Sequence, residues 1–338
     1  MRAATPQLMR SKPAPATGTV SVVATVLNEA QSIGALLDSL CRQTAIPDEV
    51  IIVDGGSADG TVGLAEEFRD RLPLRVFVVE GCTIAAGRNR AIETAQGEYI
   101  AVTDAGVRLV PRWLESLLEP LRSGRADVSS GFFVSDPHSL FELALGATTL
   151  PLAEEIDPAK FLPSSRSIAF RKKAWAEVGG YPEHLDYCED LVFDQRLRRW
   201  GYRFAWVPEA VACTRPRPDL AAFFLQYYRY ARGDGKAGLW WRRHAMRYAA
   251  YLLLAPGLRV PVLWPLLACG AAAYLARPLG HLRPHLASLG PRDRLEALAW
   301  VPVIRLAGDV AKMAGYPAGL WWRWRREHVS SPPGRGLG

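Results

Sequence analysis

The chain has 338 residues, enough for one large domain or two ordinary ones, and its formal net charge is +7. Residues 1–214 carry 22 Lys+Arg and 28 Asp+Glu (net −6), whereas residues 215–338 carry 19 and 6 (net +13). Five dispersed cysteines without a Cys-x-x-Cys pair argue against a zinc site or a disulfide framework. The basic, Trp-rich C-terminal part indicates an anionic partner, either a membrane surface or a nucleic acid.

The N-terminal segment has no apolar stretch of the kind found in signal peptides. Its Pro, Ala and Thr content predicts a disordered leader over residues 1–18. A disordered tail is predicted over residues 331–338.

Strand and helix patterns alternate four times in the first 105 residues. Apolar, β-branched runs predict strands at residues 20–27, 49–53, 74–79 and 98–103. Helical spacing follows the first three strands; Ile33, Leu36, Leu37 and Leu40, for example, share one helical face. The alternation predicts an α/β fold with a doubly wound parallel sheet.

The pattern loosens after the fourth strand. We expect helices at 111–121 and 171–178, strands at 127–134, 167–170 and 202–207, and an acidic helix start at Glu189 and Asp190. Residues 137–163 have no clear pattern, and a lid or an acceptor-side excursion is the interpretation there.

Carboxylates follow two of the predicted strands. Asp104 ends the fourth strand, and ligands bind at the carboxyl ends of strands in open α/β sheets. Asp54 ends the second strand within DGGSADGT, and Asp59 begins the next helix. This turn is neither the G-x-G-x-x-G of dinucleotide sites nor a P-loop, and its two acids would repel a bare phosphate. They suit hydrogen bonds to a base or ribose; the alternatives are a helix-capping loop and a simple turn.

Four segments in this order resemble family 2 glycosyltransferases of the GT-A fold: VSVVATVLNEA, VIIVDGGSADGT, GRNRAIETAQGEYIAVTDAG and SSRSIAFRKKAWAEVGGYPEHLDYCEDLVFDQRLRRWG. The resemblance covers about residues 20–235. It implies a GT-A-type α/β fold, a doubly wound mixed sheet with helices on both faces, followed by a hydrophobic or amphipathic helical region. The catalytic domain is implied at 19–238, with a donor half at 19–106 and an acceptor half at 107–238.

The resemblance also implies roles for particular residues. Asp54 matches the carboxylate that binds the nucleobase, and Asp104 matches the first acid of the DxD motif. Asp190, next to Glu189, matches the general base. The remaining positions implied at the nucleotide are Glu29, Asp59, Arg88 and Asn89, and those resembling the QxxRW motif, with Tyr in place of Trp, are Gln226, Arg229 and Tyr230.

One departure from the family pattern concerns the metal. The resemblance implies Mg²⁺ or Mn²⁺ at Asp104, but the second acid of DxD is here Gly106. Divalent cations prefer several oxygen ligands, so one protein carboxylate would depend on the diphosphate and water. The alternatives are another side chain as ligand or an arginine in place of the ion.

Residues 239–330 predict a membrane-associated helical region. Residues 248–276 are largely apolar but contain Pro256, Pro261 and Pro265, which favour a kinked or re-entrant segment over a straight span. Residues 295–322 carry Arg305, Asp309 and Lys312 on one face, a pattern typical of an interfacial helix, with the Trp/Arg cluster after it as an anchor. The alternative is a buried, soluble helical domain.

The sequence therefore predicts a membrane-associated, inverting glycosyltransferase. Its expected donor is a nucleotide sugar, its acceptor a lipid-linked or cell-envelope glycan, and its location the cytoplasmic face of the cell membrane. The alternative is a catalytically silent GT-A domain acting as a binding or assembly subunit. We expect no nucleic-acid partner, because the basic residues lie beside long apolar runs.

Overall fold

The computed structural model describes residues 18–329. The predicted leader, apart from Gly18, and the predicted tail lie outside the described residues. The sheet of the N-terminal domain has eight strands. They are β1 Val20–Val26, β2 Glu49–Asp54, β3 Leu74–Val78, β4 Tyr99–Asp104, β5 Val107–Leu109, β6 Val128–Ser135, β7 Ile168–Arg171 and β8 Phe204–Thr214.

The strand order is β3-β2-β1-β4-β7-β6-β8-β5. The first four strands along the chain run parallel to one another, and β7 runs antiparallel to both β4 and β6. Every residue from Tyr99 to Thr103 in β4 is buried, as expected for a central strand covered on both faces. The predicted mixed α/β sheet is present, and β8 is longer than the predicted 202–207.

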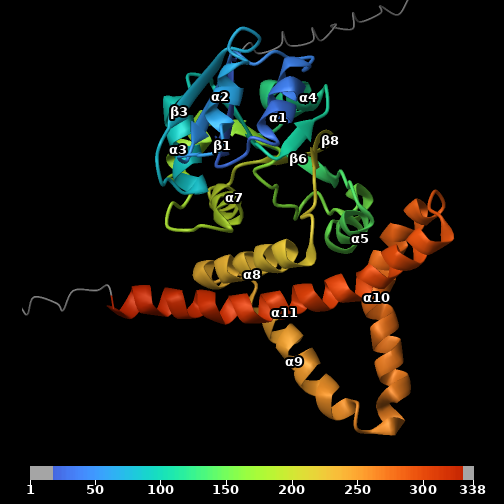
Figure 1. The fold of residues 1–338 in the computed structure, drawn as a ribbon. Helices are drawn as coiled ribbons and strands as arrows, with labels where there is room; N and C mark the ends of the chain where they lie inside the picture. Colours follow the sequence, from blue (N-terminus) through green and yellow to red (C-terminus); the bar gives the residue numbers. More distant parts are fainter. Residues whose placement is uncertain (1–17, 330–338) are drawn as a thin grey trace, which may run out of the picture.

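Helices cover both faces of this sheet (Figure 1). On one face, α1 and α4 pack against the even-numbered residues of β1, with Leu36 and Trp113 fully buried. On the other face, α3 and α7 pack against Val23, with Ile92 and Phe193 fully buried. The helices of this domain are α1 Ile33–Cys41, α2 Thr61–Glu66, α3 Ile84–Thr94, α4 Trp113–Arg122, α5 Leu140–Thr149, α6 Lys172–Glu177 and α7 Glu189–Arg199. The unassigned stretch 137–163 thus contains α5 and a short 3₁₀ helix, Ala153–Glu155.

Two long helices, α8 Leu220–Ala237 and α11 Pro291–Val329, lie side by side beneath the sheet domain (Figure 1). They pack closely because α11 presents glycines to α8. A Cβ atom at Gly315 would overlap the Tyr228 carbonyl oxygen, and one at Gly319 would overlap that of Arg232. Phe141 and Leu145 of α5 join the apolar contact between α8 and α11, which links the two regions.

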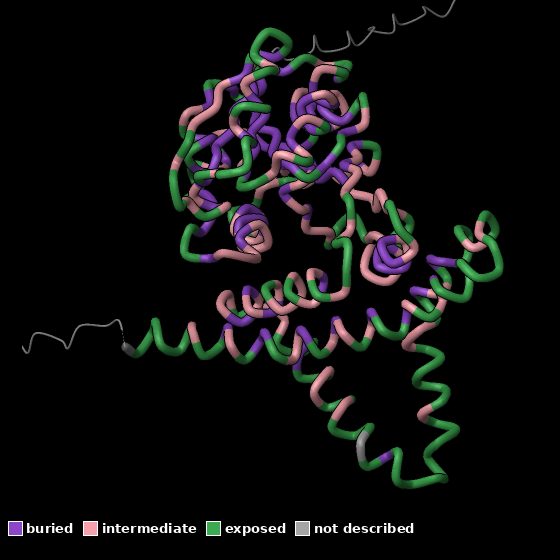
Figure 2. Tube along the Cα trace, viewed as in Figure 1, coloured by how far each residue is buried: buried purple, intermediate pink, exposed green. Residues whose placement is uncertain are grey.

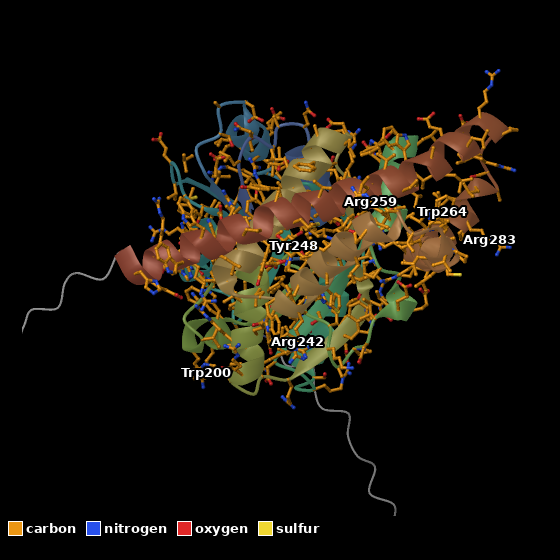
Figure 3. The ribbon with its side chains drawn as sticks, turned by 90° about the horizontal axis from the view of Figure 1, so that it is seen from below. Trp200, Arg242, Tyr248, Arg259, Trp264 and Arg283 are labelled. Atoms are coloured by element: carbon orange, nitrogen blue, oxygen red, sulfur yellow. The ribbon has the colours of Figure 1, made fainter. Side chains whose placement is uncertain are left out.

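The helices α9 Trp241–Gly257 and α10 Trp264–Leu286 form a V-shaped hairpin that projects from α11 (Figure 1). A 3₁₀ turn, Pro261–Leu263, separates them, so the apolar stretch is interrupted where its prolines predicted an interruption. Most of the hairpin is exposed (Figure 2), and Figure 3 marks Arg259 and Trp264 at its turn. One helical stretch, Pro261–Leu286, is long and apolar enough to cross a membrane, with a mean hydropathy of 1.4.

The polar stripe of α11 packs against the neighbouring helices, and the interfacial helix stays a prediction. The Asp309 carboxylate accepts hydrogen bonds from Arg247 Nε (2.7 Å) and the Tyr274 hydroxyl (2.5 Å). Arg305 lies over the ring of Tyr274, at 4.0 Å from its centroid. These partners come from α9 and α10. The polar stripe is thus packed against polar partners, and the apolar faces of the hairpin helices stay exposed.

Candidate active site

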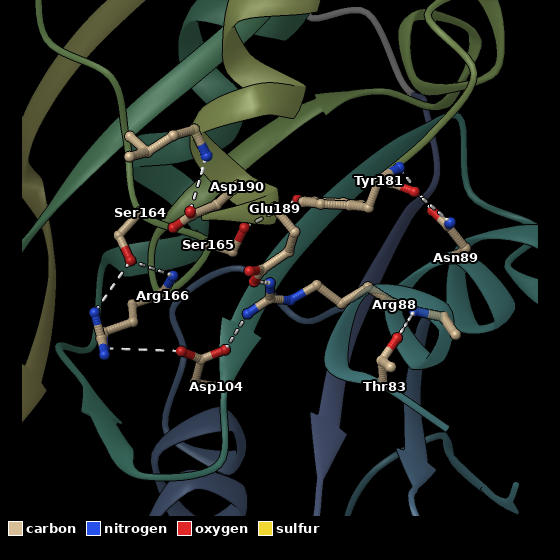
Figure 4. Close-up of polar contacts among 12 residues, drawn as sticks. Thr83, Arg88, Asn89, Asp104, Ser164, Ser165, Arg166, Tyr181, Glu189 and Asp190 are labelled. Atoms are coloured by element: carbon tan, nitrogen blue, oxygen red, sulfur yellow. Dashed lines mark hydrogen bonds and ion pairs between the residues drawn. The ribbon is translucent and has the colours of Figure 1, made fainter. Parts of the chain in front are cut away.

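An arginine joins two carboxylates from distant parts of the chain (Figure 4). Arg88, in α3, donates through Nη2 to Asp104 Oδ1 (2.7 Å) and through Nη1 to Glu189 Oε1 (2.6 Å). Its side chain is only 3% exposed. Three predicted site residues, from the end of β4, the middle of α3 and the start of α7, therefore meet at one point.

The charges in this cluster control one another. Burial disfavours the charge on Arg88, but the carboxylates of Asp104 and Glu189 outweigh it and raise the pKa of Arg88. Burial alone would raise the pKa of Asp104, yet Arg88 and Arg166 hold it below its usual value. Asp104 and Arg88 are therefore ionised throughout the physiological range.

The two adjacent acids at the start of α7 behave differently. Burial and the neighbouring Asp190 raise the pKa of Glu189 to about 7, against the pull of Arg88. Burial also raises the pKa of Asp190, against the pull of Arg88 and Arg166. The pair therefore keeps a bound proton to a higher pH than ordinary carboxyl groups do. Perturbed pKa values of this kind are common at sites of proton transfer.

This pair predicts the acid limb of the pH profile. If transfer needs the ionised base, the rate at saturating substrate should rise with pH through an apparent pKa above that of an ordinary carboxyl group, since burial raises the pKa of Asp190. Glu189→Gln should move the limb to lower pH, because Asp190 then loses a competing negative charge. The measurement is transfer rate against pH for both proteins. A limb near pH 4 in the wild type would contradict the prediction.

Arg166 is a site residue that sequence reasoning missed. Because β7 runs antiparallel to β4 with Val102 opposite Ile168, the same register places Arg166 opposite Asp104. Arg166 Nε lies 3.7 Å from Asp104 Oδ2, and Nη1 donates to Ser164 Oγ (3.2 Å) (Figure 4). The only signal in the sequence is an arginine just before a short apolar run. Its meaning depends on the direction and register of the pairing.

The segment resembling QxxRW reaches this cluster through α8. The Tyr230 hydroxyl accepts a hydrogen bond from Gln226 Nε2 (3.0 Å), and Tyr230 lies close enough to the Arg166 guanidinium to raise the pKa of Arg166. Arg229 Nη1 donates to the Tyr187 hydroxyl (3.3 Å). Gln226, Arg229 and Tyr187 line a small cavity of about 130 Å³ beside the cluster. A larger one, of about 440 Å³, lies between α7, α8 and α11, and is lined by none of the clustered acids.

The carboxylate predicted to bind the nucleobase, that of Asp54, makes hydrogen bonds within its own turn. Asp54 is buried, and its Oδ1 accepts from the backbone N–H groups of Gly56 (2.8 Å) and Ser57 (2.7 Å). Its Oδ2 accepts from the Ser57 hydroxyl (2.5 Å). Since β1, β2 and β4 run parallel, this turn lies at the same edge of the sheet as Asp104. In this structure Asp54 shapes the loop; contact with a base stays a prediction.

Substitution of Asp54 tests that role. We expect Asp54→Ala to weaken nucleotide binding by about 1–3 kcal/mol, the range for a lost hydrogen bond to a charged group. Since Asp54 also orders its turn, Ser57→Ala serves as the control: it removes the hydrogen bonds that the Ser57 hydroxyl makes with Asp54 and with the Asn28 N–H, and keeps the carboxylate. Calorimetry with the best nucleotide decides. Equal losses of nucleotide affinity in the two variants would mean that Asp54 orders the loop and does not bind the nucleotide.

The other predicted nucleotide residues make contacts within the protein. Asp59 accepts from the Ala30 backbone N–H (3.0 Å) and from the Thr61 hydroxyl (2.5 Å), and Glu29 accepts from the Ser32 hydroxyl. Asn89 Nδ2 donates to the Tyr181 carbonyl (2.9 Å), and its Oδ1 accepts from the Tyr181 N–H (2.9 Å). These contacts join the loops around the cluster, and the direct donor roles stay predictions.

The residues at Asp104 do not fit a protein-built site for a divalent cation. A guanidinium lies on each side of the single carboxylate, and the second acid position of DxD is Gly106. Within residues 18–329, no group of three or more His, Cys, Asp or Glu side chains could hold a metal ion. Mg²⁺ and Mn²⁺ favour oxygen-rich, anionic surroundings, whereas both oxygens of the Asp104 carboxylate face guanidinium groups.

Family models match nearly the whole described chain. One, described as glycosyl transferase family 2, matches residues 21–175, and another, described as glycosyl transferase family group 2, matches residues 158–306. The family model of the first half thus covers Asp54, Arg88 and Asp104. The second covers Asp190 and continues through α10.

Among relatives, the succinoglycan biosynthesis protein ExoA of Rhizobium meliloti is 29% identical over 226 residues, which is 64% of this chain and 68% of that protein. The glycosyltransferase AglE of Haloferax volcanii is 27% identical over 223 residues, or 64% and 72%. Among solved structures, the mannosyltransferase PcManGT of Pyrobaculum calidifontis, determined with GDP-Man and Mn²⁺, has a TM-score of 0.54 at 22% identity, over 91% of this chain and 90% of that one. The structural likeness shows the fold. Together with the family matches and the mixed sheet, it establishes that this chain belongs to the family 2 glycosyltransferases of the GT-A fold.

Proposed function

We propose that this glycosyltransferase moves a sugar from a nucleotide-sugar donor to a hydroxyl group of a lipid-linked or cell-envelope glycan, with inversion at the anomeric carbon. The single observation that carries the proposal is the cluster at the carboxyl end of β4. There, Asp190, with a raised pKa, lies close enough to Arg88, Arg166 and Asp104 for their charges to act on it. Relatives that take part in polysaccharide biosynthesis, such as ExoA, support this acceptor class.

The proposed reaction is one in-line displacement. The acceptor oxygen attacks the anomeric carbon, and the bond from that carbon to the diphosphate oxygen breaks with its electron pair on the leaving nucleoside diphosphate. Asp190 takes the proton of the acceptor hydroxyl. Glu189 is held by Arg88, which keeps the start of α7 beside the reacting groups. A single displacement on one face inverts the anomeric configuration.

A panel of nucleotide sugars tests the proposal by thermal shift. A ligand that binds only the native state at 100 times its Kd adds about 2.7 kcal/mol to the free energy of unfolding. We expect one UDP- or GDP-linked sugar to raise the melting temperature, and the parent nucleoside to have a much smaller effect. A panel without any shift would contradict the donor assignment. Shifts without any transfer would favour the alternative, a silent binding subunit.

The chain is further proposed to act at the cytoplasmic face of the cell membrane, where such donors are made. Support comes from the α9–α10 hairpin. Its large exposed apolar residues include Leu252, Leu253, Leu254, Leu258, Val260, Val262, Leu263, Trp264 and Leu266. An apolar patch of this kind marks an interaction surface. The exposed arginines at the base of the hairpin, Arg242 and Arg243, suit an anionic headgroup layer.

Removing apolar surface from the hairpin should release the protein from vesicles. Leu252, Leu253 and Leu266 are 73%, 71% and 68% exposed, and each buried leucine contributes roughly 1.5–3 kcal/mol. We expect changing all three to Gln to lower binding to anionic vesicles at least about 100-fold in a sedimentation assay. Truncation near Gly238 is a poorer test, since it would also remove α11 from α8.

The matched control is Ile46→Gln, which alters an 80% exposed apolar residue of the sheet domain. This variant should sediment like the wild type. Wild-type protein that stays in the supernatant with anionic vesicles at low salt would contradict the membrane assignment.

A further inference from the structure

We propose that Arg166 takes the place of a divalent cation, so that this enzyme binds the diphosphate of its donor without a metal ion. The inference rests on the proposed function and deepens it: the positive charge that faces the leaving group comes from this side chain. Three features of the structure carry it, namely the charge around Asp104, the freedom of Arg166 compared with Arg88, and the open position at Gly106.

The first feature is the local charge. The end of β4 presents one carboxylate between two guanidinium groups, and Arg88 also binds Glu189. A DxD pair in the same place would add a second carboxylate, with one more negative charge and further oxygen ligands for a dication. Without that acid the surroundings of Asp104 are less suited to a dication, and the guanidinium of Arg166 favours a phosphate.

The second feature is that only one of the two arginines is free to meet a ligand. Both Nη atoms of Arg88 are used by carboxylates, and the side chain is 3% exposed. The Arg166 side chain is 26% exposed, and its contact with Asp104 is a long one, at 3.7 Å. Arg166 can therefore turn a guanidinium edge to a diphosphate, a geometry that favours paired hydrogen bonds.

Arg166 is also held in place for this task. Its Nη1 donates to Ser164 Oγ, it lies over the Phe133 ring at 5.4 Å from the centroid, and Tyr230 is close enough to raise the pKa of Arg166. Because the side chain is already ordered, little conformational entropy is lost when it binds the diphosphate. Tyr230 thereby acquires a positioning role, through Arg166.

The third feature allows the reverse experiment. A Cβ atom at Gly106 would meet no heavy atom within 4 Å, so an aspartate can be accommodated there. Gly106→Asp restores the second acid of the DxD pattern beside Asp104. It should create a metal requirement that the wild type lacks.

The test is calorimetry of UDP and GDP binding to the full chain in detergent, in EDTA and in Mn²⁺. The wild type should bind one of them with affinities that agree within about 3-fold in the two buffers. Arg166→Ala should weaken diphosphate binding about 10–100-fold in EDTA, the range for a lost charge-assisted hydrogen bond, and Arg166→Lys should lose less. The bare nucleoside should bind the wild type and Arg166→Ala alike, which separates a diphosphate contact from general damage to the site.

Gly106→Asp should bind the same nucleoside diphosphate at least about 10-fold more tightly in Mn²⁺ than in EDTA. A wild type that binds only in Mn²⁺, or an Arg166→Ala variant with unchanged diphosphate affinity, would overturn the inference and leave the proposed function standing. Failure of the wild type to bind any nucleoside diphosphate in either buffer would overturn both.

Discussion

Asp190→Asn is expected to lower sugar transfer by at least about 100-fold, because general-base assistance contributes typically 10²–10⁴-fold. The amide keeps the shape of the side chain and its place in the first turn of α7, but it cannot accept a proton near neutral pH. Donor binding and folding should therefore be unchanged. The measurement pairs a transfer assay with nucleotide affinity on the same preparation.

An alternative role for Asp190 is a helix-start carboxylate that interacts with the helix dipole, an effect of about 0.3–1 kcal/mol. Its Oδ1 does accept from the Leu191 backbone N–H (2.8 Å). Asp219→Asn, at the start of α8, is the matched control, since Asp219 caps that helix through Oδ1 and the Ala222 N–H (2.8 Å). If Asp190→Asn transferred sugar as fast as this control, Asp190 would act only as a helix cap, and another residue would have to be the general base.

Arg88→Ala is expected to destabilise the fold by about 3–5 kcal/mol, the range for removing one partner of a buried ion pair. Two carboxylates, from β4 and α7, would lose their shared counter-charge within a nearly closed site. Both would then bind protons more readily, so the loss should be greatest near neutral pH and smaller towards pH 5. Denaturant titration of the full chain at both pH values measures it.

The control for Arg88 is an arginine whose ion pair is exposed. Arg71 pairs with Asp38 at 2.9 Å, and both side chains are about half exposed. Arg71→Ala should leave the free energy of unfolding close to that of the wild type, since water replaces the lost contact. If Arg88→Ala behaved in the same way, the cluster would not tie α3 to β4 and α7.

Local sequence patterns were sufficient to predict most elements of the sheet domain. Runs of Val and Ile are buried on both faces of a sheet, so the first four strands were predicted within about two residues of their bounds. Beyond β4 the prediction was weaker. Residues 137–163 contain α5, whose apolar residues face three helices rather than one and therefore lack a single clear stripe.

The α/β class, the place of Asp104 at a strand end and the acidic start of α7 could be predicted from the sequence, because these depend on side-chain periodicity and on neighbours along the chain. Which residues those acids contact depends on the tertiary structure. Arg88 and Glu189 are 101 residues apart, and Arg166 faces Asp104 only because β7 enters the sheet antiparallel. The same holds for Asp309 of α11, whose partners come from α9 and α10. Charged side chains carry no signal of their partner in the local sequence, since the pairing depends on strand direction, register and helix packing.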